Sequence, residues 1–187
     1  MAIIIEPVTT RFQEAAMLDI RRSVFEQELK IALAPLRVSD NSDALHILAI
    51  DDLQCKPVAT LSVVETTGDL ALHQKCCLEF TPSARSARYT QLAVIRSYRG
   101  LNIPMKMMLE AHRLFVAPRN FEYTWLVLGA AVAQSSFLCT QLGFSAGEKT
   151  FLTEYGLCRL LTRDERMLRF EQPAARAAMA SHKKEIT

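Results

Sequence analysis

The sequence lacks the patterns that mark metal sites, disulfide scaffolds and membrane spans. Its five cysteines are odd in number and form no C-x-x-C pair, and its four histidines are scattered singly. We therefore expect no metal site and no disulfide framework. No apolar run approaches the roughly 18 residues that cross a bilayer, and the first residues do not resemble a secretory signal. These absences favour a reducing compartment, and cytoplasm is the expected location.

An excess of charge of one sign is also missing. The chain has 22 basic and 20 acidic residues and a net charge of +2, which argues against a nucleic-acid-binding surface. Half of the residues are apolar and 22% are charged, as in an ordinary globular domain. A length of 187 residues suits one domain with a sizeable core.

Hydrophobic periodicity predicts strands alternating with helices. Strands are expected over residues 2–5, 45–50, 58–65, 89–95, 123–128, 143–150 and 155–162. Helices are expected over 11–29 and 130–141 and from residue 103 onward, with a short helix inside the connection 69–87. This order predicts an α+β fold built on a mixed sheet. We expect one domain over 1–163, followed by a partly helical or disordered extension over 164–187.

One segment, Gln91 to Pro104, carries most of the functional signal. It runs from an apolar strand through the turn Arg99-Gly100 into an amphipathic helix. Such a turn directs backbone N–H groups and the positive end of the helix dipole at one place, which suits a pyrophosphate or another anion. Asn102 tolerates the left-handed conformation that the turn needs. Pro104 fits the first helical turn but supplies no N–H.

Two stretches resemble motifs of the GNAT (general N-acetyltransferase-like) acyltransferases. Leu92–Val94 followed by Tyr98–Gly100 is similar to the acetyl-coenzyme-A-binding motif, an L-x-V strand and then Q/R-x-x-G-x-G/A. Asn102 and Pro104 stand in place of its two glycines. Further along, Cys139–Phe144 is similar to the family's Y-x-x-L-G-F in all but the first residue. The resemblance implies a mostly antiparallel sheet with helices on both faces.

The resemblance also implies the reaction and its partners. The donor would be acetyl-CoA or another acyl-CoA, or an acyl carrier protein, and the acceptor a small-molecule amine or an amino acid. The amine would attack the thioester directly, without a covalent acyl-enzyme and without a metal. In this family the strand ending at Val94 diverges from the next strand, 123–128, and the pantetheine arm lies in the V between them. Donor contacts are expected at Leu92, Ala93, Val94, Arg99, Gly100, Leu101, Asn102 and Ile103.

Four further residues are candidates for chemistry or acceptor binding. Cys139 takes the position of the family's Tyr, the acid that protonates the leaving thiolate; a thiol with a pKa near 8.5 can donate a proton, and a packing role is the alternative. Glu65 lies where relatives often place a general base, or it is a solvated strand-end carboxylate. Arg21 and Arg22 are candidates to bind a polar substrate, or they are surface charges.

A narrower resemblance points to acyl-homoserine lactone synthases and N-acyl amino acid synthases. It rests on the pattern Arg-x-x-Val-Phe at 21–25 and on Phe-x-x-Gly-Glu at 144–148. Those relatives carry E-x-S-R before L-A-V, and here Arg88, Thr90 and Gln91 stand at the Glu, Ser and Arg positions. Two alternatives therefore stay open beside a general N-acyltransferase. One is a long-chain synthase of N-acyl amino acids or lactones, and the other is a non-catalytic module that binds an acyl thioester or a partner protein.

Overall fold

The computed structural model describes residues 2–31, 44–76, 78–130, 137–153 and 156–167. Half of the predicted helix 130–141 and most of the predicted extension 164–187 lie outside these ranges. The described elements are β1 (Ile3–Pro7), α1 (Arg11–Arg21), η1 (Arg22–Glu28), β2 (Ala44–Asp51), β3 (Lys56–Glu65), α2 (Leu70–Cys76), β4 (Ser86–Val94), η3 (Arg96–Tyr98), α3 (Ile103–Ala111), η4 (His112–Val116), β5 (Tyr123–Gly129), α5 (Phe137–Gln141), β6 (Ser145–Thr153) and β7 (Gly156–Asp164). They follow the predicted order, and their bounds differ from the predicted ones by a few residues.

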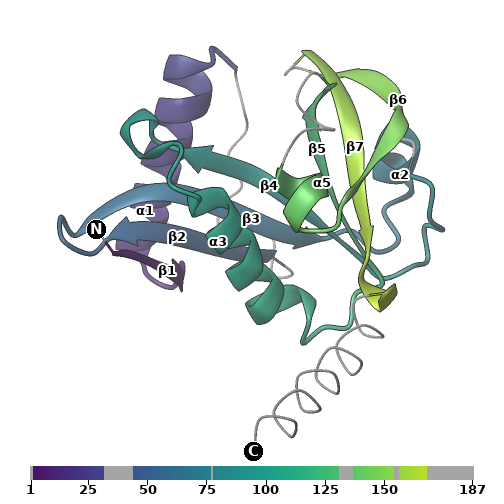
Figure 1. Ribbon diagram of the computed structural model, residues 1–187, viewed down its shortest axis with the longest axis horizontal. Coiled ribbons are helices and arrows are strands. Elements are labelled where there is room, and N and C mark those ends of the chain that lie inside the picture. The colour runs from purple at the N-terminus through teal and green to yellow at the C-terminus, as the bar shows by residue number, and fades with distance from the viewer. Residues whose placement is uncertain (1, 32–43, 77, 131–136, 154–155, 168–187) are drawn as a thin grey trace, which may run out of the picture.

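The strands form a single sheet in the order β1-β2-β3-β4-β5-β7-β6 (Figure 1). Every neighbouring pair is antiparallel except β4 and β5, which are parallel. A parallel pair needs a crossover connection, and here the chain crosses through α3 and η4. The prediction of a mixed, mostly antiparallel sheet is confirmed.

Helices cover both faces of the sheet, as predicted. In Figure 1, α1 lies behind β2 and β3 and α3 lies in front of them. Side chains that alternate along β2 divide between the two faces: Ile47 and Ala49 belong to the core beneath α3, whereas Leu48 packs with Met17 of α1. Alternate positions of the same strand therefore contribute to the cores on the two faces of the sheet.

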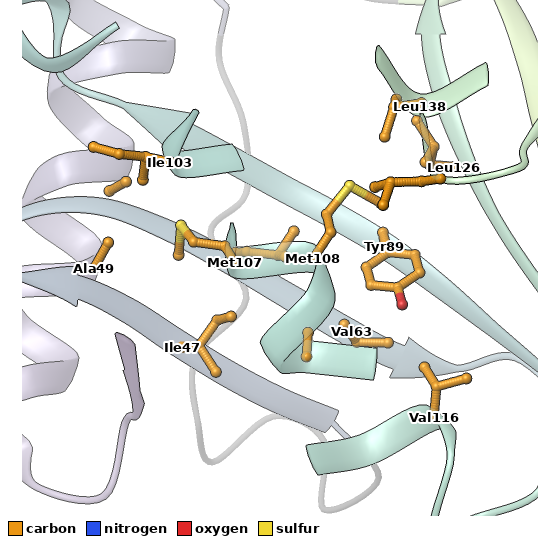
Figure 2. Close-up of a cluster of buried hydrophobic side chains, with 14 of the residues drawn as sticks. Ile47, Ala49, Val63, Tyr89, Ile103, Met107, Met108, Val116, Leu126 and Leu138 are labelled. Carbon is orange, nitrogen blue, oxygen red and sulfur yellow. The ribbon is translucent and has the colours of Figure 1, made fainter. Parts of the chain in front are cut away.

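The larger core lies beneath α3. Ile103, Met107 and Met108 of this helix belong to one buried cluster with Ile47 and Val63 (Figure 2), and all five are at most 3% exposed. Burial of one such aliphatic side chain contributes about 1.5–3 kcal/mol. This packing fixes α3, and hence its N-terminus, against the middle of the sheet.

The first helix begins at a capping box. The Gln13 backbone N–H donates to Thr10 Oγ1 at 3.2 Å, and the Thr10 backbone N–H donates to Gln13 Oε1 at 3.0 Å. Each side-chain oxygen thus accepts a hydrogen bond from the other residue's backbone. The predicted helix over 11–29 is present as α1 and the π-helical stretch η1. None of the helices in the described ranges is long and apolar enough to span a membrane.

Candidate functional site

The two central strands separate after three residue pairs. β4 pairs with β5 only from Ser86 to Arg88, opposite Tyr123 to Trp125. Beyond that point β4 stays paired with β3 as far as Val94, and β5 stays paired with β7 as far as Gly129. Figure 1 shows β4 and β5 running apart from their common end. The predicted V between these strands is confirmed.

A cavity of about 430 Å³ occupies this V. Its walls come from seven elements and are mostly apolar, as in many small-molecule sites. The lining residues are Phe25, Leu61, Arg88, Tyr89, Thr90, Gln91, Leu92, Pro104, Met108, Leu126, Val127, Leu128, Gly129, Leu138 and Cys158. The side chain of Met108 points from α3 toward Leu126 in the wall of the cavity (Figure 2).

A β-bulge interrupts β4 where it borders the cavity. Thr90 pairs with Ser62 and Ala93 with Thr60, so two residues of β4 oppose one residue of β3. Gln91 takes a left-handed conformation with φ of 52°, which is uncommon for a residue other than glycine. Bulges and strained residues of this kind concentrate at functional sites, where they redirect the backbone. No local pattern in the sequence predicts this bulge.

Beyond the bulge, the open edge of β4 offers backbone groups to the V. The Ile95 amide donates to the Val58 carbonyl at 3.0 Å, and backbone groups of successive residues point to opposite sides of a strand. The Val94 N–H therefore points away from β3, toward the open side. Of the predicted donor contacts in this strand, Leu92 lines the cavity, whereas Ala93 is 1% exposed and lies in the core beneath α1.

The N-terminus of α3 lies at the cavity's edge, where Pro104 forms part of the wall. Gly100 has φ of 83° and Asn102 has φ of 56°, so the left-handed turn predicted at Asn102 is confirmed. The first helical hydrogen bond runs from the Lys106 amide to the Asn102 carbonyl at 3.2 Å. The amides of the first turn stand outside the helix's own ladder, at the end of the dipole that attracts anions.

Arg99 links the turn before α3 to the end of η1. Its Nη1 and Nη2 atoms donate to the two carboxylate oxygens of Glu28 at 2.5 and 2.8 Å, and its Nε donates to the Val94 carbonyl at 3.1 Å. The hydrogen bond to Arg99 lowers the pKa of Glu28, and the same bond raises the pKa of Arg99. The predicted phosphate ligand is thus held by a carboxylate within the protein.

Arg21 is buried, in contrast to the surface-charge alternative for this residue. It is 2% exposed, and its Nη2 donates to Ser62 Oγ at 2.6 Å and to Thr60 Oγ1 at 3.3 Å. Burial lowers the pKa of Arg21 to about 10. Arg22 is exposed and donates to Asp19 at 3.2 Å. Neither arginine is among the lining residues of the cavity.

Glu65 lies at the end of β3 beside the closed end of the V. It pairs in register with Ala87, within the stretch where β4 and β5 are still joined. Its carboxylate is 3.9 Å from Arg119 Nη1, and it does not line the cavity. Its role as a general base stays a prediction.

Two thiols lie near the inner wall of the V. Cys139 follows Leu138, which lines the cavity, but Cys139 itself packs partly buried against the core beneath α3. Cys158 of β7 does line the cavity, is 1% exposed, and has its Sγ 3.2 Å from Thr153 Oγ1. The sequence singled out Cys139 because of its motif position, and it gave no signal for Cys158.

The Leu142-Gly143-Phe144 stretch is held by a buried polar network. Arg163 Nη1 donates to the Leu142 carbonyl at 3.0 Å, and Gly143 has φ of 69°. The Arg163 guanidinium carbon lies 4.9 Å from the centre of the Phe144 ring, and Phe144 meets Tyr89 of β4 edge to face. The motif therefore turns the chain sharply and locks it against the sheet near the cavity wall.

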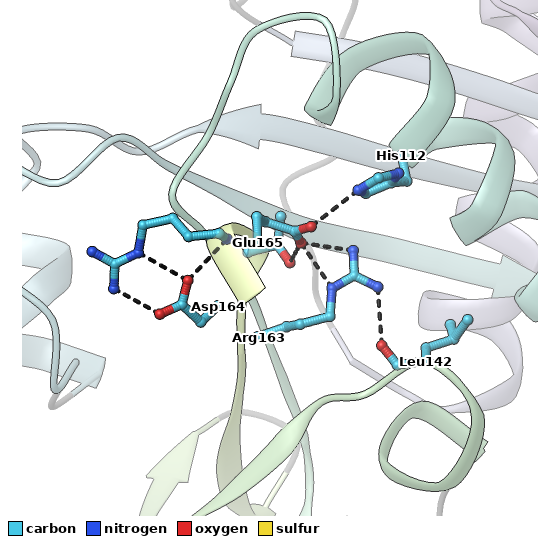
Figure 3. Close-up of polar contacts among 7 residues, drawn as sticks. His112, Leu142, Arg163, Asp164 and Glu165 are labelled. Carbon is cyan, nitrogen blue, oxygen red and sulfur yellow. Dashed lines mark hydrogen bonds and ion pairs between the residues drawn. The ribbon is translucent and has the colours of Figure 1, made fainter. Parts of the chain in front are cut away.

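Glu165 connects this network to the rest of the fold (Figure 3). It accepts hydrogen bonds from Arg163 Nε at 2.8 Å and from Thr124, and its Oε2 is 3.0 Å from His112 Nε2. Burial by itself would raise the pKa of Glu165, but His112, Arg163 and Thr124 outweigh it and hold that pKa below its ordinary value. Among the described residues, no cluster of three or more His, Cys, Asp and Glu could hold a metal ion.

The sheet is mixed and splayed between its central parallel strands, with a bulge in β4 and a helix N-terminus at the cavity. Together these features define the GNAT fold. Solved structures of GNAT acyltransferases superimpose on the chain. FeeM, an N-acyl amino acid synthase from uncultured soil microbes, is 10% identical with a TM-score of 0.69 over 87% of this chain and 91% of FeeM. BjaI, a CoA-dependent acyl-homoserine lactone synthase solved with SAM and isopentyl-CoA, is 15% identical with a TM-score of 0.64 over 87% of this chain and 83% of BjaI.

An acyl-CoA N-acyltransferase from Pseudomonas aeruginosa is 18% identical, with a TM-score of 0.58 over 87% of this chain and 98% of that one. No protein-family model matches the sequence, and no curated protein does either. At these identities the likeness establishes the fold. The fold class and the GNAT resemblance predicted from the motifs are confirmed.

Proposed function

We propose that this protein transfers an acyl group from a coenzyme A or acyl-carrier-protein thioester to an amine by direct attack. The observation that carries the proposal is the apolar cavity between the separated strands β4 and β5, with the N-terminus of α3 at its edge. An elongated thioester has a phosphate end, a pantetheine arm and an acyl end, and the V offers a matching surface for each.

The donor would bind along the open edge of β4. Amides of the first turn of α3 and of the left-handed turn at Gly100 and Asn102 would receive its phosphates. The Val94 N–H would bind the pantetheine arm or the thioester oxygen. The acyl chain would enter the space bordered by Met108 and Leu138, which are apolar and line the cavity.

The reaction depends on positioning the amine against the thioester and forms no covalent acyl-enzyme. The amine loses a proton to water or to a carboxylate, its nitrogen bonds to the thioester carbonyl carbon, and the carbon–sulfur bond then breaks. Backbone N–H groups at the open edge of β4 stabilise the oxyanion, and holding both reactants in one cavity supplies much of the acceleration. The thiolate takes its proton from solvent, from Cys139 or from Cys158.

A second candidate function is the synthesis of long-chain N-acyl amino acids. The apolar lining favours it, because Met108 and Leu138 border the expected acyl end of the cavity and suit a longer acyl chain. The superposition on FeeM adds support, since FeeM is an N-acyl amino acid synthase. The two candidates share the reaction and differ in acyl length and in the acceptor.

Native mass spectrometry with a panel of acyl-CoA species and acyl carrier proteins tests the proposal. We expect one donor to bind per chain, and we expect free thiol to appear when amines are added to the bound complex. Tight binding without thiol release under any amine would support the non-catalytic module. Absence of binding to every thioester would rule out the proposed function altogether.

A further inference from the structure

The wall of the cavity includes a charged residue at the closed end of the V. Arg88 is the last residue of β4 that pairs with β5, directly opposite Trp125. Among the described residues that line the cavity, it is the sole side chain with a formal charge. Its guanidinium carbon lies 5.1 Å from the centre of the Trp125 ring, so the indole supports the cation from one side.

Arg88 has no counter-charge in the part of the chain that the structure describes. None of the ion pairs found there includes it, and its Nε is buried without a hydrogen-bond partner among those residues. A buried polar group left unpaired costs free energy. A guanidinium beside an apolar cavity suits a carboxylate, which a guanidinium can bind through two parallel hydrogen bonds.

The side chain also points to the face on which an acceptor would enter. Tyr89, the next residue, belongs to the core beneath α3, whereas Trp125 packs with Cys76 of α2 on the opposite face. Side chains alternate along a strand, so Arg88 faces away from α3. The donor's phosphates would lie at α3, which leaves the face bearing Arg88 for the second substrate.

We infer that Arg88 recognises the carboxylate of the acceptor, and that the acceptor is an amine that also carries a carboxylate, such as a free amino acid. This inference rests on the proposed function. The bulge at Gln91 lies three residues along β4, about 10 Å away at the usual rise per residue. The Arg88 side chain and a bound amino acid together span that distance. The acceptor amine then meets the thioester carbonyl beside the bulge.

The acceptor's ammonium group first loses a proton to water, and the uncharged nitrogen forms a bond to the acyl carbon. The carbon–sulfur bond breaks, the nitrogen gives its second proton to water, and the thiolate takes up a proton from solvent. The carboxylate of the acceptor stays bound to Arg88 throughout and takes no part in bond exchange. Arg88 is thus a specificity-determining residue.

The test compares free L-amino acids with their carboxamides, which differ in charge and not in the amine. With the preferred acyl-CoA as donor, we expect the wild type to favour the free acid. Arg88→Gln should lower kcat/KM for the free acid by about 10- to 100-fold and leave the carboxamide within a few-fold. Arg88→Lys should recover part of the loss. Arg113→Gln, at an exposed site on η4, serves as the control for removal of a surface arginine.

Calorimetry separates the failure of this inference from the failure of the proposed function. Acyl-CoA affinity should be the same for wild type and Arg88→Gln, and circular dichroism should show the same melting temperature. An equal loss on acid and carboxamide, or a wild type that does not distinguish them, would overturn the role of Arg88 while acyl transfer stands. If no amine is acylated, direct titration of L-amino acids and carboxamides decides the matter: loss of acid binding in Arg88→Gln supports the carboxylate site, and its retention refutes it.

Discussion

Arg99 and Glu28 are joined by two hydrogen bonds, although 71 positions separate them in the chain. The pair ties the turn before α3 to the end of η1, so the turn is held in place before any donor arrives. It also means that the Arg99 charge is largely compensated within the protein.

Reversal of the charge at Arg99 should weaken donor binding. Arg99→Glu places two carboxylates beside the expected phosphate site, and we expect acyl-CoA affinity to fall about tenfold or more at low salt. Glu28→Gln frees the guanidinium, and affinity should hold or rise. Calorimetry at two salt concentrations measures both effects. The matched control is Arg113→Glu on the exposed side of η4, and equal affinities in Arg99→Glu and this control would contradict the placement of the phosphates.

Filling the cavity at Met108 should shorten the acyl chains that the protein accepts. The side chain is 3% exposed and lines the cavity, so Met108→Trp occupies acyl space. In the wild type each added methylene should raise kcat/KM about fourfold until the cavity is full, from about 0.8 kcal/mol per buried methylene. The variant should reach its optimum at a shorter chain in an acyl-CoA series.

The neighbouring Leu109 provides the control for that substitution. It is 52% exposed on the same helix, so Leu109→Trp adds the same ring outside the cavity and should leave the chain-length profile unchanged. A profile that moves equally in both variants would show that the effect comes from the helix and not from the cavity.

The two thiols near the inner wall should respond differently to removal. If Cys139 is the acid, Cys139→Ala should lower kcat and Cys139→Tyr should preserve or raise it. If Cys139 only packs against the core, Cys139→Ala should lower the free energy of unfolding by about 1 kcal/mol with little change in turnover. We expect this second result, because Cys139 packs against the core beneath α3. Cys158→Ala tests the cavity-lining thiol in the same assay. Unchanged turnover in both alanine variants assigns the proton to solvent.

Glu165 should make the stability of the fold depend on acid pH. Its folded-state pKa lies below the ordinary value of 4.5, so its carboxylate contributes stability above pH 4.5 that is lost as pH falls through the folded pKa. Glu165→Gln leaves Arg163 and His112 without their carboxylate and should cost about 3 kcal/mol near neutral pH. The variant's unfolding free energy should also change less between pH 5 and pH 3.

Urea denaturation over that pH range measures both quantities. Glu110→Gln, which breaks an exposed pair with Arg113, is the control and should change stability little. If the unfolding free energies of wild type and Glu165→Gln fall in parallel between pH 5 and pH 3, other carboxylates cause the loss of stability in acid.

The sequence predicted turns, strands and helices because neighbouring residues determine local backbone conformation. Gly100 and Asn102 were expected in a turn that needs positive φ, and both adopt it. Apolar periodicity placed the strands and helices, since a side chain's face follows from its position along its own element. The splay of β4 from β5 came from the family resemblance, and the pairing pattern bears it out.

Tertiary structure decided what depends on segments far apart in the chain. The bulge at Gln91 exists because β3 and β4 pair in two registers on either side of it, which no local pattern encodes. Arg21 was expected at a substrate or on the surface, yet Thr60 and Ser62 of β3 hold it in the interior.

The same limit applies to the walls of the cavity. Motif position singled out Cys139, but the pairing of β5 with β7 brings Cys158 into the wall. In the sequence Arg88 is only a departure from a family pattern. The role inferred for it depends on its contact with Trp125 and on its position where β4 and β5 separate. The sequence by itself determined which segments form strands, turns and helices, whereas long-range strand pairing determined which side chains share a cavity, because register is settled only when distant strands meet.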